Sequence, residues 1–220
     1  VKCELGGSIA YFTLNRPEDG NKLTAGILAA LADAAVLLHG RPDLRVAVFS
    51  GEGALLCGGG DLSGDACVGL MPQGGAESCA ALITNAVETG SLSWEQAADV
   101  PKLLLPRLWR ALASVPQFSI CLANGSAMGE GLGLVACCDY TVALEGSFFS
   151  PGDITQGLVP AVVMPYILAK MGTGATKRLF CTCENMTVQR AITQGLVDEV
   201  APSLEEARKL VASLCERLTE

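Results

Sequence analysis

The fold is decided by the glycine-rich stretch CLANGSAMGEGLGLVACCDY at residues 121–140. It begins as an apolar, strand-like segment, passes through four glycines and one glutamate, and continues as apolar sequence typical of a helix. Glycine permits positive φ angles and lets other groups approach the backbone closely. Two interpretations follow, which are close packing in a buried turn or main-chain N–H groups that face a negatively charged ligand.

A second glycine-rich turn, LLCGGGDLSG at 55–64, follows the same logic, because it comes soon after the apolar segment VAVFSG at 46–51. Two such turns that converge would aim two N–H groups at one oxygen. This arrangement is an oxyanion hole, which stabilises the charge that develops on a thioester or ester carbonyl. The phosphate-binding pattern GxxxxGK[ST] does not occur, and GSAMGEGLG does not fit the dinucleotide pattern GxGxxG.

Strand and helix patterns alternate along the chain, which indicates an α/β fold. The segment 44–51 is almost wholly apolar, as expected of a strand covered on both faces. Strands are predicted at 8–15, 44–51, 119–125 and 140–144, and helices at 23–40, 101–116, 165–172, 187–200 and 203–220. Ser203 and Glu206 form the pattern of a capping box, and residues 63–101 are expected to form a mobile surface segment.

Composition excludes several classes of protein. The net charge is -8, and no basic patch suggests nucleic-acid binding. The 10 cysteines are scattered without a CxxC pair, and there is 1 histidine, so we expect no metal site and free thiols in a reducing, cytoplasmic compartment. No signal-peptide pattern or apolar run long enough for a membrane span is present, and the start at Val1 suggests a piece of a longer chain.

Four stretches in order resemble the crotonase (enoyl-CoA hydratase/isomerase) superfamily: FTLNRPEDGNKLT, RVAVFSGEGALLCGGGDL, ANGSAMGEGLGLVACCDYTVA and AITQGLVDEV. The resemblance implies a spiral of repeated ββα units over 1–200, followed by the start of a C-terminal helical region at 201–220 that is shortened or marks a domain boundary in a larger synthase. It also implies trimers or hexamers, and an acyl thioester carried on CoA or on the phosphopantetheine of an acyl-carrier protein, with no other cofactor.

Carried over residue by residue, the resemblance places the two oxyanion donors at the N–H groups of Gly58 and Glu130. The family usually has glycine at the second position, and we expect the Glu130 side chain to point away from the site. The first of two catalytic glutamates falls on Gly133, which leaves that role vacant, and the second falls on Asp153. The sequence SPGD is also good turn chemistry, so a turn or cap remains the alternative for Asp153.

A single carboxylate fits one-base chemistry better than hydration by two carboxylates. The chain is similar to the dehydratases of polyketide β-branching cassettes, which also lack the first glutamate and act on a 3-hydroxy-3-methylglutaryl group held by a carrier protein. The alternatives are an enoyl-CoA hydratase or isomerase, a decarboxylase of the same cassette, and a non-catalytic crotonase-like domain.

Other polar residues have simpler interpretations. Asp139 is expected to anchor the backbone, and Cys57, with no histidine to activate it, is expected to be structural rather than nucleophilic. Lys22, Arg16 and Lys102 are expected to be solvated, with contact to a carrier phosphate as the alternative. Asp61 is expected to cap a helix and His39 to lie at a helix end.

Overall fold

A computed structural model describes residues 1–60, 101–152 and 161–220 of the chain. The segment that we predicted to be mobile therefore lies, up to residue 100, outside the described residues. The helix predicted at 101–116 is present as α5.

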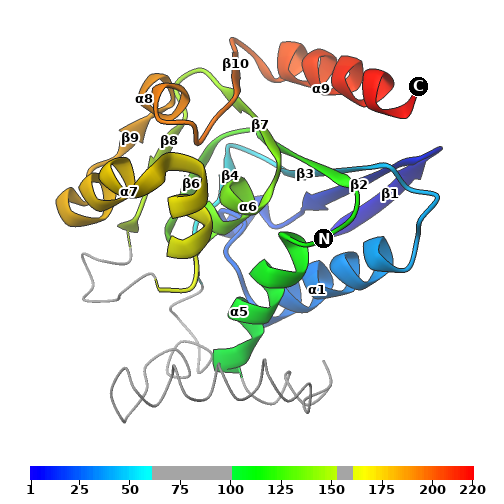
Figure 1. Ribbon diagram of the computed structural model, residues 1–220, viewed down its shortest axis with the longest axis horizontal. Helices are drawn as coiled ribbons and strands as arrows, with labels where there is room; N and C mark the ends of the chain where they lie inside the picture. The colour runs from blue at the N-terminus through cyan, green and yellow to red at the C-terminus, as the bar shows by residue number, and fades with distance from the viewer. Residues whose placement is uncertain (61–100, 153–160) are drawn as a thin grey trace.

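A larger sheet of 6 strands forms the centre of the molecule, in the order β1-β2-β3-β5-β7-β10 (Figure 1). Its strands are β1 (Lys2–Gly6), β2 (Ile9–Leu14), β3 (Val46–Gly51), β5 (Phe118–Ala123), β7 (Tyr140–Leu144) and β10 (Glu199–Ala201). Within this sheet, as far as the structure describes it, the β1–β2 pairing is antiparallel and the other pairings are parallel. Phe12 of β2 is in register with Phe49 of β3, and their rings stack with centroids 5.2 Å apart.

A smaller sheet of 4 strands has the order β4-β6-β8-β9. Its strands are β4 (Leu55–Cys57), β6 (Ser126–Met128), β8 (Phe148–Ser150) and β9 (Met186–Thr187). Strands β3, β5 and β7 of the larger sheet are each followed by the next strand of the smaller sheet, and α6 and α7 then follow β6 and β8. This repeated ββα order confirms the predicted fold class.

Helices cover both faces of the larger sheet (Figure 1). Val46 and Val48 of β3 belong to the apolar cluster that includes Val211 of α9 (Leu204–Thr219). Ala47 and Phe49, which alternate with them, belong to the main core with α1 (Ala25–His39) and α5 (Pro101–Leu112). The alternation confirms that this apolar strand is buried on both faces.

The predicted helix boundaries hold where a capping residue is present. Helix α1 begins after Thr24, whose side chain accepts a hydrogen bond from Ile27 N, and ends before Gly40. Helix α9 begins after Ser203, whose Oγ accepts from Glu206 N at 3.2 Å. The Ser203 half of the predicted capping box is therefore confirmed. The Glu206 carboxylate instead pairs with Lys209.

The prediction of one helix over 187–200 is wrong. Helix α8 (Val188–Thr193) is short, and Gly195 follows it with φ of +79°. The chain then forms β10, which pairs in parallel with β7 and completes the larger sheet. Helix α7 (Met164–Thr182) is longer than predicted and passes through a kink at Gly172 with φ of +73°. Glycine with positive φ leaves the helical conformation in both places.

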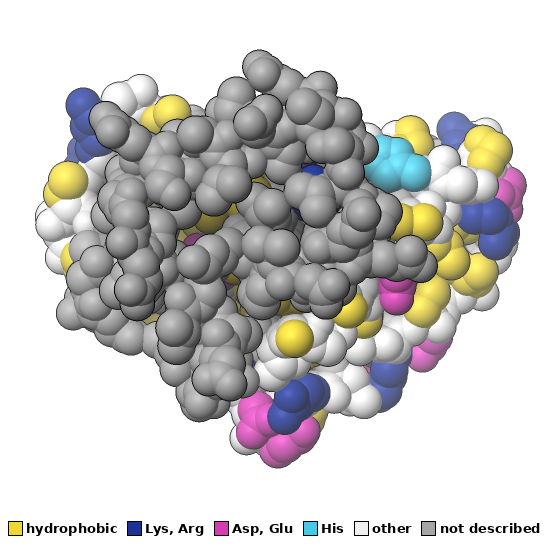
Figure 2. All heavy atoms as spheres, turned by 90° about the horizontal axis from the view of Figure 1, so that it is seen from below, with side chains coloured by type: hydrophobic (Ala, Val, Ile, Leu, Met, Phe, Trp, Pro, Cys, Tyr) yellow, Lys and Arg dark blue, Asp and Glu magenta, His cyan; other side chains and the backbone are white. Residues whose placement is uncertain are grey.

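No helix of the described part is long and apolar enough to cross a membrane. On the face shown in Figure 2, basic and acidic side chains of the described residues lie next to one another.

Candidate active site

Two glycine turns leave the same edge of the smaller sheet. Strands β4 and β6 are parallel neighbours, so the segments that follow their carboxyl ends meet at one place. The first segment is Gly58–Gly60, and the second is the single 3-10 turn η2 (Gly129–Gly131), which leads directly into α6 (Leu132–Cys137). The sheet therefore brings together the two stretches that the sequence singled out.

The two turns are in direct contact. Gly59 has φ of +94°, and a Cβ added to it would lie 3.0 Å from Met128 O and 3.7 Å from Gly129 Cα. In the same way, a Cβ on Gly131 would lie 2.8 Å from Cys57 Cβ. Side chains at Gly59 and Gly131 would push the turns apart, because such distances are shorter than ordinary carbon contacts.

The Gly58 amide, which we predicted as the first oxyanion donor, is already engaged. Its N–H donates to Gly20 O at 2.8 Å, and an amide has one hydrogen to donate. Gly60 differs, because no hydrogen bond between described residues is donated by its N–H, and a Cβ built on it would meet no atom within 4 Å. Three consecutive glycines offered three candidate amides, and the sequence could not rank them.

Glu130 lies in the second turn, where the resemblance placed the other donor. The residue is half-buried, and its Oε2 atom is buried. The glutamate therefore fits into this turn with part of its carboxylate inside the protein. The expectation that its side chain points away from the site remains a prediction.

Gly133, the position of the missing first glutamate, is covered by the indole ring of Trp109. A Cβ on Gly133 would lie 2.5 Å from Trp109 Cε2 and 2.6 Å from Cζ2. Trp109 lies on α5, and its side chain is 0% exposed. A glutamate at this position would collide with the ring, so the glycine and the tryptophan are structurally matched.

Asp153, the predicted acid or base, lies outside the described residues. Strand β8 and Pro151, which precede it, are described, and β8 pairs with β6, the strand that leads into the second glycine turn. The proposed role of Asp153 therefore rests on the sequence resemblance alone.

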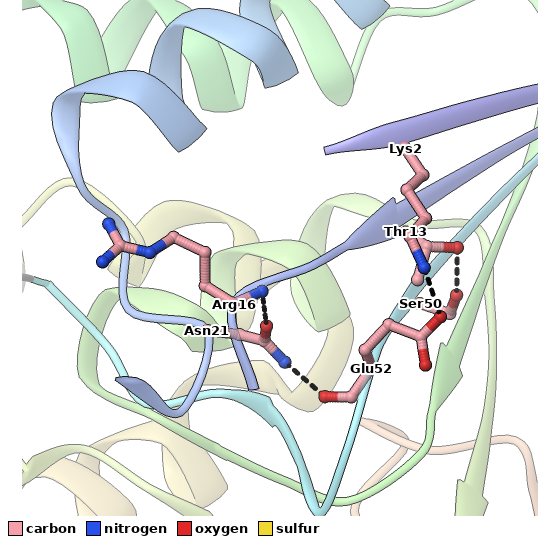
Figure 3. A network of polar contacts seen from close by, with 6 residues as sticks. All are labelled: Lys2, Thr13, Arg16, Asn21, Ser50 and Glu52. Carbon is pink, nitrogen blue, oxygen red and sulfur yellow. Dashed lines mark hydrogen bonds and ion pairs between the residues drawn. The ribbon is translucent and has the colours of Figure 1, made fainter. Parts of the chain in front are cut away.

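Two asparagines that the sequence analysis did not single out hold the loop before β4. Asn21 is 0% exposed with φ of +54°. Its Nδ2 donates to Glu52 O at 2.9 Å, and its Oδ1 accepts from Arg16 N at 2.9 Å (Figure 3). The same Nδ2 also donates to Leu55 O at 2.8 Å. In the sequence, the one signal for a special role of Asn21 was its position directly after Gly20. Asparagine tolerates the positive φ of such turns better than most residues.

Asn124, at the end of β5, binds the same loop from the other side. Its Oδ1 accepts from Gly51 N at 2.8 Å, and its Nδ2 donates to Gly53 O at 2.9 Å. Between them, the two asparagines bind Gly51 N and the carbonyls of Glu52, Gly53 and Leu55, and so fix the start of β4. The position of the first glycine turn follows from that.

The backbone next to Asn21 also lies along the first glycine turn. Leu23 N donates to Gly59 O at 2.8 Å, and the Cys57 thiol donates to Asn21 O at 3.2 Å. Cys57 is buried, so it packs as a structural thiol, as predicted. The turn is held on one side by residues 20–23 and on the other by Met128 and Gly129.

The three basic residues considered for a carrier phosphate differ in their surroundings. Arg16 pairs with Asp19 and with Glu18. Lys22 is exposed, and its Cγ would lie 3.6 Å from a Cβ on Gly58, next to the first glycine turn. Among the described ion pairs none involves Lys22. The side chain of Lys102 lies outside the described residues.

Of the remaining polar predictions, the one for Asp61 lies outside the described residues, and those for Asp139 and His39 concern structural contacts. Asp139 Oδ2 accepts from both N and Oγ of Ser119 at 2.8 Å, which confirms its anchoring role. His39 is the last residue of α1, and its Nε2 contacts Ala111 O of α5 at 3.3 Å. Within the described ranges, no group of three or more metal-binding side chains is clustered.

The sequence profile of the enoyl-CoA hydratase/isomerase family matches residues 87–220. This span is more than half of the chain. The protein belongs to the enoyl-CoA hydratase/isomerase family.

Individual relatives are distant. The chain is 27% identical over 198 residues to the enoyl-CoA hydratase AKT6-1 of Alternaria alternata, covering 90% of this chain but only 57% of that protein. It is 28% identical over 207 residues to a Thermus thermophilus protein described as an enoyl-CoA hydratase, covering 93% of this chain and 73% of that one. The chain thus spans little more than half the length of the Alternaria relative.

Solved structures share the fold. An enoyl-CoA hydratase/isomerase from Marinobacter aquaeolei superimposes with a TM-score of 0.80 at 22% identity, covering 99% of this chain and 76% of that one. Pseudomonas aeruginosa AtuE gives a TM-score of 0.81 at 20% identity over 99% of this chain and 76% of its own. At these identities the likeness establishes the architecture.

Proposed function

We propose that this protein binds an acyl thioester and holds its carbonyl oxygen between the N–H groups of Gly60 and Glu130. The observation that carries the proposal is the direct contact of Gly59 with Met128 and Gly129, which places one amide-bearing turn against the other. Gly60 replaces Gly58 in this scheme, because the Gly58 amide donates to Gly20. Two preorganised amides lower the energy of an enolate oxygen without reorganisation during the reaction.

The reaction that this site supports best is dehydration of a 3-hydroxyacyl thioester. A base removes the proton from C2, and the electron pair of that bond forms an enolate on the thioester carbonyl. The C3–oxygen bond then breaks, the hydroxyl takes a proton from an acid, and water leaves. The products are a 2,3-unsaturated thioester and water, and Asp153 is the residue we propose for proton transfer.

The packing of Trp109 on Gly133 favours chemistry with one carboxylate over the two-glutamate mechanism. A hydratase of the two-glutamate type needs a carboxylate where Gly133 stands, and the indole ring takes up the adjacent volume. The similarity to β-branching dehydratases leads us to propose a 3-hydroxy-3-methylglutaryl group on an acyl-carrier protein as the substrate. Hydration of an enoyl-CoA is the second candidate, because the names of the Alternaria and Thermus relatives state it.

The carrier is proposed to reach the site past Lys22, which lies exposed beside the first glycine turn. An ammonium group there would attract a phosphate of CoA or of phosphopantetheine. We further propose that the protein forms trimers or hexamers, as in the crotonase superfamily, and that it acts in the cytoplasm.

The test is mass spectrometry of the intact carrier after incubation with the protein. We expect 3-hydroxy-3-methylglutaryl carrier protein to lose the mass of one water, and crotonyl-CoA to gain water slowly or not at all. Rapid hydration of crotonyl-CoA would instead support the second candidate function, hydration of an enoyl-CoA. Asp153→Asn is expected to lower the rate of dehydration at least a hundredfold, and full activity of that variant would remove Asp153 from the scheme.

A further inference from the structure

The indole N–H of Trp109 is a buried donor without an acceptor among residues 1–60, 101–152 and 161–220. The side chain is 0% exposed, and Nε1 has no hydrogen-bond partner in the protein as described. Buried tryptophan N–H groups usually find a partner, and an unmet donor in the interior is costly. Such a group calls for an acceptor that the described residues do not supply, such as a bound molecule.

The donor lies beside the second glycine turn. Cε2, the ring atom bonded to Nε1, is the atom closest to the Cβ position of Gly133, at 2.5 Å. Gly133 is in the first turn of α6, which follows η2 and Glu130 directly. The N–H is therefore one covalent bond from the ring atom that contacts α6. Helix α6 directly follows the turn that carries Glu130, the proposed oxyanion donor.

The main chain fixes the ring in this place. The Trp109 carbonyl accepts a hydrogen bond from the Cys137 thiol at 3.5 Å, at the other end of α6. The contact with the Gly133 backbone holds the ring itself. A donor that is held this rigidly contributes selectivity, because a ligand without an acceptor leaves it unpaired.

We propose that Trp109 Nε1 donates a hydrogen bond to an oxygen of the acyl group beyond the thioester carbonyl. The proposal rests on the thioester function above and adds the residue that determines specificity: Trp109 selects acyl chains that carry a hydroxyl or carboxylate over plain hydrocarbon chains. A fixed water on Nε1 is the competing explanation, and it makes no such distinction between ligands.

The test compares unreactive thioether analogues of phosphopantetheine in matched pairs, glutaryl against pentanoyl and 3-hydroxybutyryl against butyryl. We expect the wild-type protein to bind at least one oxygenated analogue about tenfold more tightly than its partner, which corresponds to about 1.4 kcal/mol. In Trp109→Phe, which keeps an aromatic ring but lacks the N–H, this preference falls to twofold or less. Equal preference in the two proteins would overturn the proposal.

Fluorescence provides a second measurement, which leaves Trp109 itself unchanged. The chain has 2 tryptophans, so Trp94→Phe leaves Trp109 as the only indole. We expect its emission to shift with the preferred oxygenated analogue and to stay constant with the matched hydrocarbon. An unchanged spectrum with both bound analogues would contradict the proposal.

These outcomes separate the two levels of inference. If the analogues bind without discrimination while a thioester substrate is turned over, the Trp109 proposal fails and the proposed function stands. If no analogue binds and no thioester is turned over, both fail. Turnover is measured by mass spectrometry and selectivity by binding, so each failure has its own signature.

Discussion

Gly59 is so close to Met128 that a Cβ added to the glycine would lie 3.0 Å from the methionine carbonyl oxygen. The two residues are far apart in the sequence: Met128 is the last residue of β6, and Gly59 lies in the turn that follows β4. Their contact is what brings the two glycine turns together. A proposed oxyanion hole between these turns depends on that distance.

Gly59→Ala is expected to damage both stability and turnover. Alanine at φ of +94° costs roughly 1–2 kcal/mol for a left-handed backbone, and the close approach to Met128 adds about 1–3 kcal/mol. We expect the rate on the preferred thioester to fall at least tenfold, since the turns move apart. Urea unfolding and steady-state kinetics measure the two effects.

Gly146→Ala is the matched control for that substitution. Gly146 has φ of +83°, and a Cβ on it would meet nothing within 4 Å. It therefore carries the backbone cost without the collision, and its kinetics should remain those of the wild type. Equal losses in the two variants would mean that the contact of the turns has no part in activity.

Much of the fold follows from the sequence, because the apolar patterns are strong. The all-apolar segment at 44–51 predicted a strand covered on both faces, and Val46 and Ala47 do lie on opposite faces. The misread segment was 187–200, where Gly195 ends a helix and β10 gains its stability from pairing with β7. A three-residue strand of this kind has no local pattern, because the partner strand supplies its hydrogen bonds.

Asn21→Asp is expected to lower the free energy of unfolding by about 2–4 kcal/mol. Aspartate keeps the acceptor for Arg16 N but loses both bonds donated by Nδ2. It also turns a carboxylate toward the carbonyls of Glu52 and Leu55 and removes the donor that both share, although Leu55 O still accepts from Asn124 Nδ2 at 3.4 Å. Chemical denaturation measures the loss, and kcat should fall with it because the first glycine turn is no longer fixed.

An exposed asparagine provides the comparison for this change. Asn185 lies on the surface, so Asn185→Asp should alter stability by less than about 0.5 kcal/mol. If both variants are equally stable, the hydrogen bonds of Asn21 do not hold the loop in solution.

The site was harder to predict than the fold, since its residues meet only in three dimensions. The sequence identified both glycine turns, but a hydrogen bond from Gly58 to Gly20 decides which amide faces outward. The vacancy at Gly133 could be noted from the sequence, whereas the ring that covers it comes from α5. Trp109 had no motif around it, and only its packing identifies it.

Lys22→Ala is expected to raise KM for CoA or carrier-protein thioesters three- to tenfold and to leave kcat unchanged. The ammonium group lies outside the reacting centre and attracts only the carrier phosphate, an effect that salt should weaken. Lys177, which is exposed on α7, serves as control. A rise in KM of the same size for Lys177→Ala would show a general charge effect rather than a phosphate contact.

Stability should decline at alkaline pH because of Cys138. A hydrogen bond with Cys121, together with burial, raises the pKa of this thiol well above its usual value. The folded protein therefore retains a proton that the unfolded chain loses above about pH 8.5. This contribution to stability is complete below that pH and is lost as the pH rises toward the folded pKa, by up to about 1.4 kcal/mol per pH unit.

Cys138→Ala should make this alkaline decline shallower, as measured by urea unfolding between about pH 7.5 and 10. The variant is expected to be less stable at neutral pH, because it leaves a small cavity, so the slope is the informative quantity. Cys181 is exposed, and Cys181→Ala should keep the wild-type slope. A wild-type slope in Cys138→Ala would show that the buried thiol does not titrate differently on folding.

The packing of Trp109 on Gly133 predicts a strong coupling between the two positions. Gly133→Ala places a Cβ 2.5 Å from Trp109 Cε2, which overpacks the core and should cost about 1–3 kcal/mol. In a Trp109→Ala background the ring is gone, so the same substitution should cost less than about 0.5 kcal/mol. A double-mutant cycle by chemical denaturation gives the coupling directly. If Gly133→Ala costs the same in both backgrounds, the indole ring moves aside without a measurable cost. In that case Gly133→Glu could restore a carboxylate where the indole now lies.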